Sequence, residues 1–243
     1  KGSLYVLAAR PGVGKSALAI QMTYETAKRG LRASYVSLEM SSSECAGRLL
    51  SNASGVRKPT GKGFLNAGHK QKLETQVQAM QTWPITFKDD NQATMQSIEA
   101  FVAKQRLEGE LGLIVIDYLQ LLSVPGMDSR VQEISLISRE LKKIAMMYEV
   151  PVLALSQLNR ALESQNRNPM LSDLRESGSI EQDADCVLLM HREKEVDPTN
   201  DDIICNVAKN RNGEVRATKL TFTKPTGRYS TRVDARLNDK KPF

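Results

Sequence analysis

The chain has 243 residues, of which 40% are hydrophobic, and a formal net charge of +6. This length suits one α/β domain or two small ones, and the longest apolar runs, at 113–116 and 152–155, are far shorter than the roughly 20 residues of a membrane-spanning helix. The excess of Lys and Arg is compatible with nucleic acid binding, whereas an aromatic content of only 5% disfavours a base-stacking surface.

The three cysteines, Cys45, Cys186 and Cys205, are odd in number and lack the spacing of a metal site. Two of them lie in apolar stretches, so we expect small buried side chains in a reducing cytoplasm. No signal peptide is visible, and an apolar strand begins almost at the first residue. We therefore expect a piece cut from a longer protein.

Short apolar runs alternate with segments of helical periodicity, which is typical of a mostly parallel sheet with crossover helices. In chain order, the first part predicts a strand at 4–9, a helix at 15–29, a strand at 33–38, helices from 41–43 to 54 and at 69–81, a strand at 85–87, a helix after 89–91 and a strand at 113–117. The second part predicts a helix at 132–148 and strands at 152–155, 185–190, 203–209, 216–222 and 229–233.

An Asn-Gly turn within 210–213 predicts a hairpin near the C-terminus. The predicted fold is therefore α/β, with a central, mostly parallel twisted sheet flanked by helices and a C-terminal antiparallel hairpin. We expect one domain over residues 1–243.

A glycine-rich segment, A-R-P-G-V-G-K-S at 9–16, follows the first strand and opens the first helix. It matches the phosphate-binding loop pattern except for Ala9, where glycine is usual. Glycines let backbone amides turn toward phosphate, the helix N-terminus adds positive partial charge, and the Lys15 and Ser16 side chains suit phosphate and Mg²⁺. A nucleoside triphosphate with Mg²⁺ is predicted to bind Arg10, Pro11, Gly12, Val13, Gly14, Lys15, Ser16 and Ala17.

Three polar residues follow predicted strands, at the edge where ligands bind in an open parallel sheet. Asp117 ends the apolar run 113–117 and suits the second Mg²⁺ ligand; the alternative is an Asp that caps a turn. Glu39 is a candidate general base for the attacking water, or only an exposed Glu. Gln157 is a candidate sensor of the γ-phosphate, or an ordinary loop glutamine.

Two cations, Lys209 and Arg211, lie near the tip of the predicted hairpin. Residues two apart in a strand share a face, so the pair suits donation to the phosphates of another subunit, as an arginine finger does. The alternative is a solvated basic turn.

Taken together, these motifs resemble the RecA-like motor domain of DnaB-type replicative helicases. The matching segments occur in order from about residue 3 to 222, at 8–16, 37–40, 116–121, 156–160, 173–185 and 208–213. The resemblance implies ATP as the nucleotide, Glu39 as the residue that polarises water, Asp117 as the Walker B acid and Gln157 as a coupling sensor. It implies that Lys209 and Arg211 act in trans.

The resemblance also implies that Arg175, Glu176 and Gly178 bind single-stranded DNA in the central channel of a hexameric ring. The loop after Asp117, up to Arg130, is a second candidate channel loop. Expected partners are further copies of the chain, single-stranded DNA, primase and a helicase loader, without a membrane, in the cytoplasm of a bacterium or of a phage host.

One departure from the family and two alternatives remain. Family members usually carry an N-terminal domain and a linker helix, which we expect this sequence to lack. Ring formation, primase contact and unwinding depend on those parts, whereas ATP binding does not. A RecA/RadA-like recombinase shares the fold. A non-hydrolysing, nucleotide-gated assembly module is the non-enzyme alternative, and a metabolite kinase is the least favoured.

Overall fold

The computed structural model describes residues 2–57, 66–124, 126–127, 129–158, 167–174, 178–196 and 200–231. Within these residues, nine strands form one sheet in the order β3-β2-β4-β5-β1-β6-β7-β8-β9. The strands are β1 (Leu4–Ala9), β2 (Arg32–Ser37), β3 (Ile85–Asp89), β4 (Leu111–Asp117), β5 (Val152–Gln157), β6 (Cys186–Val196), β7 (Asn200–Asn210), β8 (Ala217–Thr223) and β9 (Arg228–Thr231).

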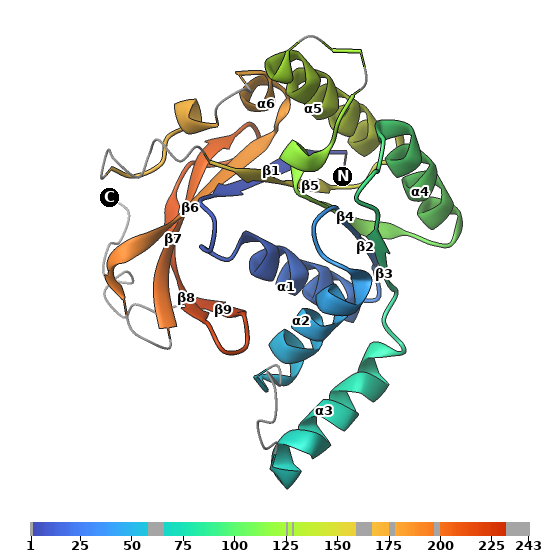
Figure 1. Cartoon of the computed structure of the whole chain (residues 1–243), viewed down its shortest axis with the longest axis vertical. Helices are drawn as coiled ribbons and strands as arrows, with labels where there is room; N and C mark the ends of the chain where they lie inside the picture. The colour runs from blue at the N-terminus through green and yellow to red at the C-terminus, as the bar shows by residue number, and fades with distance from the viewer. Residues whose placement is uncertain are drawn as a thin grey trace.

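Helices cover both faces of the sheet, with α4, α5 and α6 on one side and α1 and α2 on the other (Figure 1). Helix α3 projects away from the body and buries none of its residues (Figure 1). None of the described helices combines the length and hydrophobicity needed to cross a bilayer. The helices are α1 (Lys15–Lys28), α2 (Ser42–Ser54), α3 (Ala67–Met80), α4 (Met95–Leu107), α5 (Arg130–Met147) and α6 (Gly178–Asp183), with 3-10 turns η1 (Leu119–Leu121) and η3 (Leu171–Asp173).

The sheet is parallel from β3 to β6 and antiparallel from β6 to β9. This confirms the predicted α/β fold with a mostly parallel sheet, and β7 and β8 form the predicted C-terminal hairpin. From β1 in the middle of the sheet, the chain crosses through α1 to β2 and β3 on one side. It returns toward β1 through β4 and β5 and then passes to β6, on the other side of β1. Such a change of direction places a crevice beside the end of β1.

The structure differs from the predicted elements where the local pattern is weak. Strand β4 begins at Leu111 rather than at 113, because Gly112 breaks the apolar run; a Cβ there would lie 2.6 Å from Leu31. Strands β6 and β7 each extend to 11 residues, since their polar ends pair with one another beyond the apolar core. Helix α6 was not predicted, because six residues are too few to show helical periodicity.

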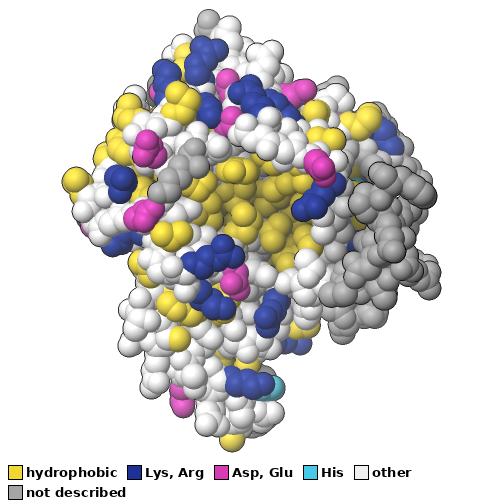
Figure 2. Space-filling model, turned by 180° about the vertical axis from the view of Figure 1, so that it is seen from behind, with side chains coloured by type: hydrophobic (Ala, Val, Ile, Leu, Met, Phe, Trp, Pro, Cys, Tyr) yellow, Lys and Arg dark blue, Asp and Glu magenta, His cyan; other side chains and the backbone are white. Residues whose placement is uncertain are grey.

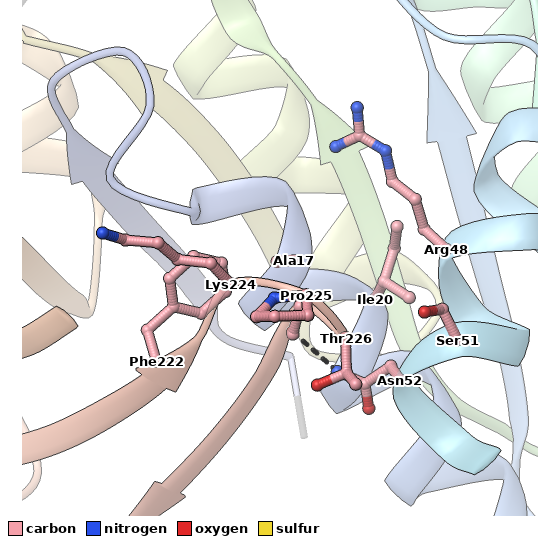
Figure 3. Close-up of a pocket in the computed structure, with 10 residues that line it drawn as sticks. Ala17, Ile20, Arg48, Ser51, Asn52, Phe222, Lys224, Pro225 and Thr226 are labelled. Carbon is pink, nitrogen blue, oxygen red and sulfur yellow. Dashed lines mark hydrogen bonds between the residues drawn. The ribbon is translucent and has the colours of Figure 1, made fainter. Parts of the chain in front are cut away.

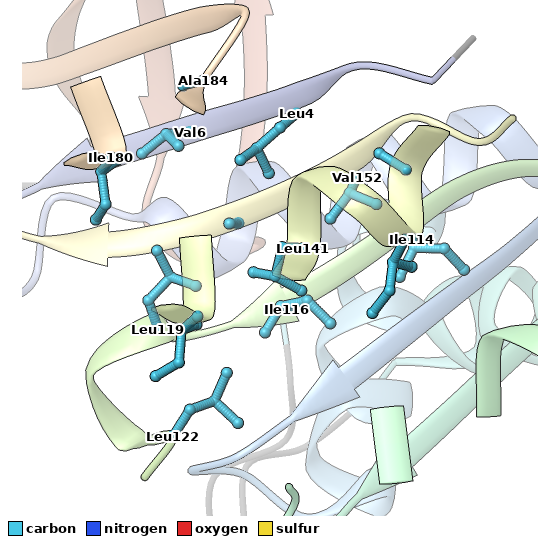
Figure 4. Packing of buried hydrophobic residues seen from close by; sticks show 14 of the residues in the cluster. Leu4, Val6, Ile114, Ile116, Leu119, Leu122, Leu141, Val152, Ile180 and Ala184 are labelled. Carbon is cyan, nitrogen blue, oxygen red and sulfur yellow. The ribbon is translucent and has the colours of Figure 1, made fainter. Parts of the chain in front are cut away.

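The core on the α5 side of the sheet is built from aliphatic side chains of β1, β4 and β5 packed against α4, α5 and α6 (Figure 4). Leu141 of α5 and Ile180 of α6 point toward this layer, and η1 contributes Leu119. The second core lies on the α1 side and contains Tyr35, Val115 and Tyr229. The two cores hold the sheet rigidly between them, which fixes the positions of the strand ends.

Charged side chains of both signs are exposed on the side of the molecule opposite to the view of Figure 1. Figure 2 shows Lys and Arg side chains close to Asp and Glu side chains, around a hollow lined with hydrophobic side chains. The net charge of +6 is therefore not gathered into one basic stripe on this face.

A nearly buried carboxylate, Asp185, ties together the start of β1, helix α5 and the C-terminal hairpin. Its Oδ2 accepts hydrogen bonds from the Leu4 amide at 2.8 Å and from Lys142 Nζ at 2.6 Å, and Arg211 lies 3.7 Å from Oδ1. Burial raises the pKa of Asp185, but the hydrogen bonds from Lys142 and Leu4 and the charge of Arg211 outweigh it, so the net shift is downward.

The Asp185→Asn substitution is expected to lower the free energy of unfolding by about 3 kcal/mol at neutral pH, because it leaves the Lys142 ammonium without its buried partner. The folded-state pKa of Asp185 lies below the unfolded value of about 3.9, so the carboxylate stabilises the fold above that pH. Its contribution is lost as the pH falls through the folded pKa. Urea unfolding of the wild type and the variant should therefore show a difference in the free energy of unfolding that is smaller at about pH 3 than at neutral pH.

The matched control is Glu140→Gln, also on α5, which breaks only a partly exposed pair with Lys143 and should cost less than about 1 kcal/mol. An Asp185→Asn variant as stable as the Glu140→Gln control at neutral pH would show that the Asp185 carboxylate does not stabilise the fold as described.

Candidate functional site

The predicted site residues meet because the parallel strands are in register at one edge. Ser37 of β2 pairs with Asp117 of β4, and Ala9 of β1 pairs with Gln157 of β5. Glu39 follows Ser37 by two residues, and the glycine-rich loop follows Ala9 directly. All of these residues therefore leave the sheet on the same side.

A cavity of about 430 Å³ lies at this edge. Nine predicted residues border it, six from the glycine-rich loop and the start of α1 and three from the ends of other strands: Pro11, Gly12, Gly14, Lys15, Ser16, Ala17, Glu39, Asp117 and Gln157. Its other lining residues are Met40, Arg48, Tyr118 and Phe222.

Two residues predicted to bind nucleotide, Arg10 and Val13, do not line this cavity. The Val13 side chain is buried in the core beside α1, since the loop needs an apolar anchor under it. Arg10 lies close enough to Asp173 for its charge to help lower the pKa of that carboxyl, which is held down mainly by a hydrogen bond from Arg167.

The glycine-rich loop needs glycine at position 14 for two separate reasons. Gly14 has φ of 104°, a left-handed conformation that other residues rarely adopt. A Cβ at this position would also lie 2.3 Å from the Tyr229 hydroxyl. That hydroxyl donates a 2.9 Å hydrogen bond to the Val13 carbonyl, so Tyr229 of β9 stabilises the conformation of the loop.

The N-terminus of α1 offers free amide groups. Helices α2, α3, α4 and α5 are each capped by a side chain, whereas no side chain caps α1 at Gly14. Uncapped amides at a helix N-terminus bind anions, and phosphate above all. Lys15 Nζ lies 3.2 Å from the Ala9 carbonyl, across the mouth of the loop. Burial lowers the pKa of Lys15, while Asp117 and Glu39 raise it.

A second support for the loop comes from β6 and β7. Arg192 Nη2 donates a 2.5 Å hydrogen bond to the Gly12 carbonyl, and its Nε lies 2.8 Å from the Asp201 carboxylate. Asp201 is only 1% exposed and is also paired with Lys224 at 2.8 Å. This interaction fixes the Gly12 carbonyl and thereby part of the glycine-rich loop.

The chemistry of the oxygen donors fits Mg²⁺. The Asp117 carboxylate is buried at the end of β4, and Ser16, the second residue of α1, lines the same cavity. Mg²⁺ takes one or two protein oxygens together with waters and substrate phosphates. Within the described residues, no group of three or more His, Cys, Asp or Glu side chains is arranged to hold a metal ion.

Glu39 is exposed at the mouth of the cavity, near Lys15 and Tyr118. Burial raises the pKa of the Tyr118 phenol, and the charges of Glu39 and Asp117 raise it further. Arg48 of α2 also lines the cavity, although sequence reasoning missed it. In the sequence, Arg48 is only an arginine in the helix that follows Glu39, and no local motif distinguishes it from an ordinary surface arginine.

Gln157 is held by a neighbour that sequence reasoning also missed. The Gln120 side chain donates to Ser156 Oγ at 2.9 Å and to the Gln157 carbonyl at 3.3 Å, and its Oε1 accepts from the Gln157 amide at 3.1 Å. The end of β5 is thereby fixed to η1, the turn that follows Asp117. A movement of Gln157 would therefore be transmitted to the loop after β4.

A second cavity, of about 210 Å³, adjoins the first and shares Ala17, Arg48 and Phe222 with it (Figure 3). Its floor is polar but occupied: Asn52 Nδ2 donates to the Gly227 carbonyl at 2.8 Å, and Ser51 Oγ donates to the Val56 carbonyl at 2.7 Å. Its walls therefore offer shape and apolar contact more than free hydrogen-bonding groups.

Lys209 and Arg211 lie at the opposite edge of the sheet from the cavity. On β6, Met190 pairs with Ala9 beside the loop, while Cys186 pairs with Asn210, so the two edges are roughly 13 Å apart along the strand. Lys209 Nζ donates to the Glu181 carbonyl, and Arg211 Nη2 donates at 2.5 Å to the Gln182 carbonyl at the end of α6. Burial lowers the pKa of Lys209, and the charge of Arg211 lowers it further.

The predicted DNA-binding residues are only partly described. Arg175 and Glu176 lie outside the described residues, and Gly178 is the exposed first residue of α6. In the second candidate loop, Arg130 donates to the carbonyls of Leu122 and Gln120 and pairs with Glu133 at 2.5 Å. Arg130 thus stabilises its own loop.

Comparisons with known proteins agree on one family. A family model described as the DnaB-like helicase C terminal domain matches residues 1–231. The replicative DNA helicase DnaB of Geobacillus stearothermophilus is 40% identical over 241 residues, which cover 94% of this chain and 52% of that protein. The chain therefore spans about half the length of the curated relatives it matches.

Two solved structures share the fold at more than 30% identity. One of them, described as an ATPase domain, superposes with a TM-score of 0.88 at 33% identity, covering 95% of this chain and 84% of that one. A DnaB-like replicative helicase, described with its interactions with primase, gives a TM-score of 0.87 at 32% identity over 94% of this chain and 57% of that one.

The Gly14→Ala substitution is expected to abolish binding of a fluorescent ADP analogue measured by anisotropy, because the new Cβ strains the backbone and displaces Tyr229. The matched control is Gly30→Ala, which shares a positive φ of 79° but has no neighbour within 4 Å. That control should lose about 1 kcal/mol of stability and keep its nucleotide affinity. Equal ADP affinities for the two variants would contradict the role given to Gly14.

Proposed function

The chain belongs to the DnaB-like helicase C-terminal domain family, and on that premise we propose that it is the ATP-hydrolysing motor of a replicative DNA helicase. The observation that carries the proposal is the single cavity bordered by Lys15, Ser16, Glu39, Asp117 and Gln157. Because the chain spans about half of its curated relatives, duplex unwinding, the DNA substrate and the partners belong to the proposal as well.

Each residue of the cavity has a role that follows from its position. The loop amides and Lys15 hold the β- and γ-phosphates, and Ser16 and Asp117 hold Mg²⁺, which when bound neutralises charge on the phosphate oxygens. Glu39 accepts a proton from the attacking water. Gln157 hydrogen-bonds a phosphate oxygen, and the Gln120 contacts carry its position to the loop after Asp117. The adjoining cavity gives the nucleoside room beside Ala17.

The position of Lys209 and Arg211 supports action on a neighbouring copy. They lie at the far edge of the sheet from their own cavity, where their side chains cannot reach their own phosphates. Both contact the last carbonyls of α6, and the predicted DNA-binding segment leads into the first residue of that helix. When ATP bound to a neighbouring copy contacts Lys209 and Arg211, it therefore also affects the position of α6, the helix that begins at the predicted DNA-binding segment.

The remaining partners follow from the family. A hexameric ring around single-stranded DNA places each ATP site between two copies, and the segment at Arg175, Glu176 and Gly178 supplies phosphate contacts that should be salt-dependent and sequence-blind. One similar helicase is described with its interactions with primase, and we extend that partner, a loader and a cytoplasmic location to this chain.

The Glu39→Gln substitution is expected to reduce ATP turnover by about 10²-fold or more while ATP is still bound, because it removes the general base but keeps the side-chain shape. Phosphate release in the presence of Mg²⁺ and single-stranded DNA, together with ATP affinity, measures the two effects. Glu74→Gln on α3, which is exposed and far from the cavity, is the matched control. Near-normal turnover in Glu39→Gln would remove Glu39 from the mechanism, and no turnover in the wild type would favour a non-hydrolysing module.

The Arg211→Ala substitution is expected to reduce ATP turnover by about 10³-fold in homogeneous assemblies, because transition-state charge loses its partner from the neighbouring copy. Mixing Arg211→Ala with Lys15→Ala subunits should restore turnover, since an intact loop in one copy meets an intact Arg211 in the next. Arg216→Ala, an exposed arginine after the same hairpin turn, is the matched control. If ATP turnover by the mixture does not exceed the turnover of either variant alone, Arg211 does not act in trans.

A further inference from the structure

A buried phenol lies directly behind the Asp117 carboxylate. Tyr35 on β2 is fully buried and pairs in register with Val115, two residues before Asp117 on the neighbouring strand. Its ring packs against Phe87 of β3, with ring centroids 5.8 Å apart. From this position the Tyr35 hydroxyl donates a 2.5 Å hydrogen bond to Asp117 Oδ2.

The same hydroxyl interacts with the other oxygen donor of the cavity. Burial raises the pKa of Tyr35 well above its ordinary value, the Asp117 charge raises it further, and a hydrogen bond with the Ser16 side chain lowers it. The Tyr35 hydroxyl thus interacts with both Asp117 and Ser16. These are the two side chains whose oxygens suit Mg²⁺.

We propose that Tyr35 is a positioning residue of the Mg²⁺ site, where its hydroxyl orients the Asp117 carboxylate and the Ser16 hydroxyl toward one cation. The hydrogen bond occupies Asp117 Oδ2 and leaves the other oxygen to face the cavity. Mg²⁺ requires near-ideal octahedral geometry, so a site with few protein ligands depends on how each is held. The inference rests on the proposed function, because it assumes a Mg²⁺–nucleotide complex in this cavity.

A core-filling role alone does not account for the hydroxyl. A buried hydroxyl is unfavourable unless it is hydrogen-bonded, and phenylalanine would fill the same space between β2 and α1 without that cost. The two roles predict different results, because a core residue affects stability and all ligand binding together. A positioning residue affects the affinity for the metal and leaves metal-free nucleotide binding intact.

The test is Tyr35→Phe in the full chain, with Tyr24→Phe as the matched control. The Tyr24 ring packs against Trp83 at an interplanar angle of 45°, with ring centroids 4.9 Å apart, and Tyr24 does not line the cavity. Mn²⁺ affinity of the ADP complex is measured by electron paramagnetic resonance, and ADP affinity by fluorescence in the presence of a chelator. For Tyr35→Phe, Mn²⁺ affinity should fall about 10-fold while metal-free ADP affinity and the apo Tm stay close to the wild type. Tyr24→Phe should change none of the three.

Two results would overturn the inference. Unchanged Mn²⁺ affinity in Tyr35→Phe would show that the hydroxyl does not position the ligands. Equal losses of Mn²⁺ affinity and of metal-free ADP affinity, or a folding defect, would assign Tyr35 to the core alone. A wild-type chain that binds no Mn²⁺ with ADP would refute the proposed function and this inference together, and that result is read from the wild type without any variant.

Discussion

The parallel register of β1, β2, β4 and β5 is the constraint on which the site depends. It aligns Ala9 with Gln157 and Ser37 with Asp117, so groups far apart in the sequence emerge at one edge. A slip of one residue in β4 would turn Asp117 to the other face of the sheet, and the same slip in β2 would turn Tyr35. The two cores prevent such a slip, because each strand is packed on both faces. The catalytic geometry is thus set by apolar packing remote from the chemistry.

The antiparallel extension of the sheet serves the same site. Tyr229 of β9 donates to the Val13 carbonyl, and Arg192 of β6, paired with Asp201 of β7, donates to the Gly12 carbonyl. The glycine-rich loop is therefore supported by the C-terminal strands. The same strands present Lys209 and Arg211 at the opposite edge, against the end of α6. The C-terminal strands therefore connect the glycine-rich loop to the pair that we propose acts on a neighbouring copy.

Much of the fold and the centre of the site could be predicted from the sequence, because their signals are local. The loop at 9–16 has a characteristic spacing, and the run that ends at Asp117 is apolar throughout. The sequence does not reveal the roles of Tyr35, Arg48 and Gln120, since only the fold brings Arg48 to the cavity, Tyr35 to Asp117 and Gln120 to Gln157. Their types are ordinary for a strand, a helix and a turn. Arg175 and Glu176 rest on the resemblance alone, as they lie outside the described residues.

We propose that one edge of the sheet forms half of a Mg²⁺–ATP site and that a second copy of the chain supplies the other half. The most direct measurement is a crystal structure of the chain with a non-hydrolysable ATP analogue and Mg²⁺. We expect phosphates against the loop amides and Lys15, Mg²⁺ held by Ser16 and Asp117, and Arg211 of a neighbouring copy directed at the γ-phosphate. Nucleotide bound away from this cavity, or Mg²⁺ held by other side chains, would contradict it.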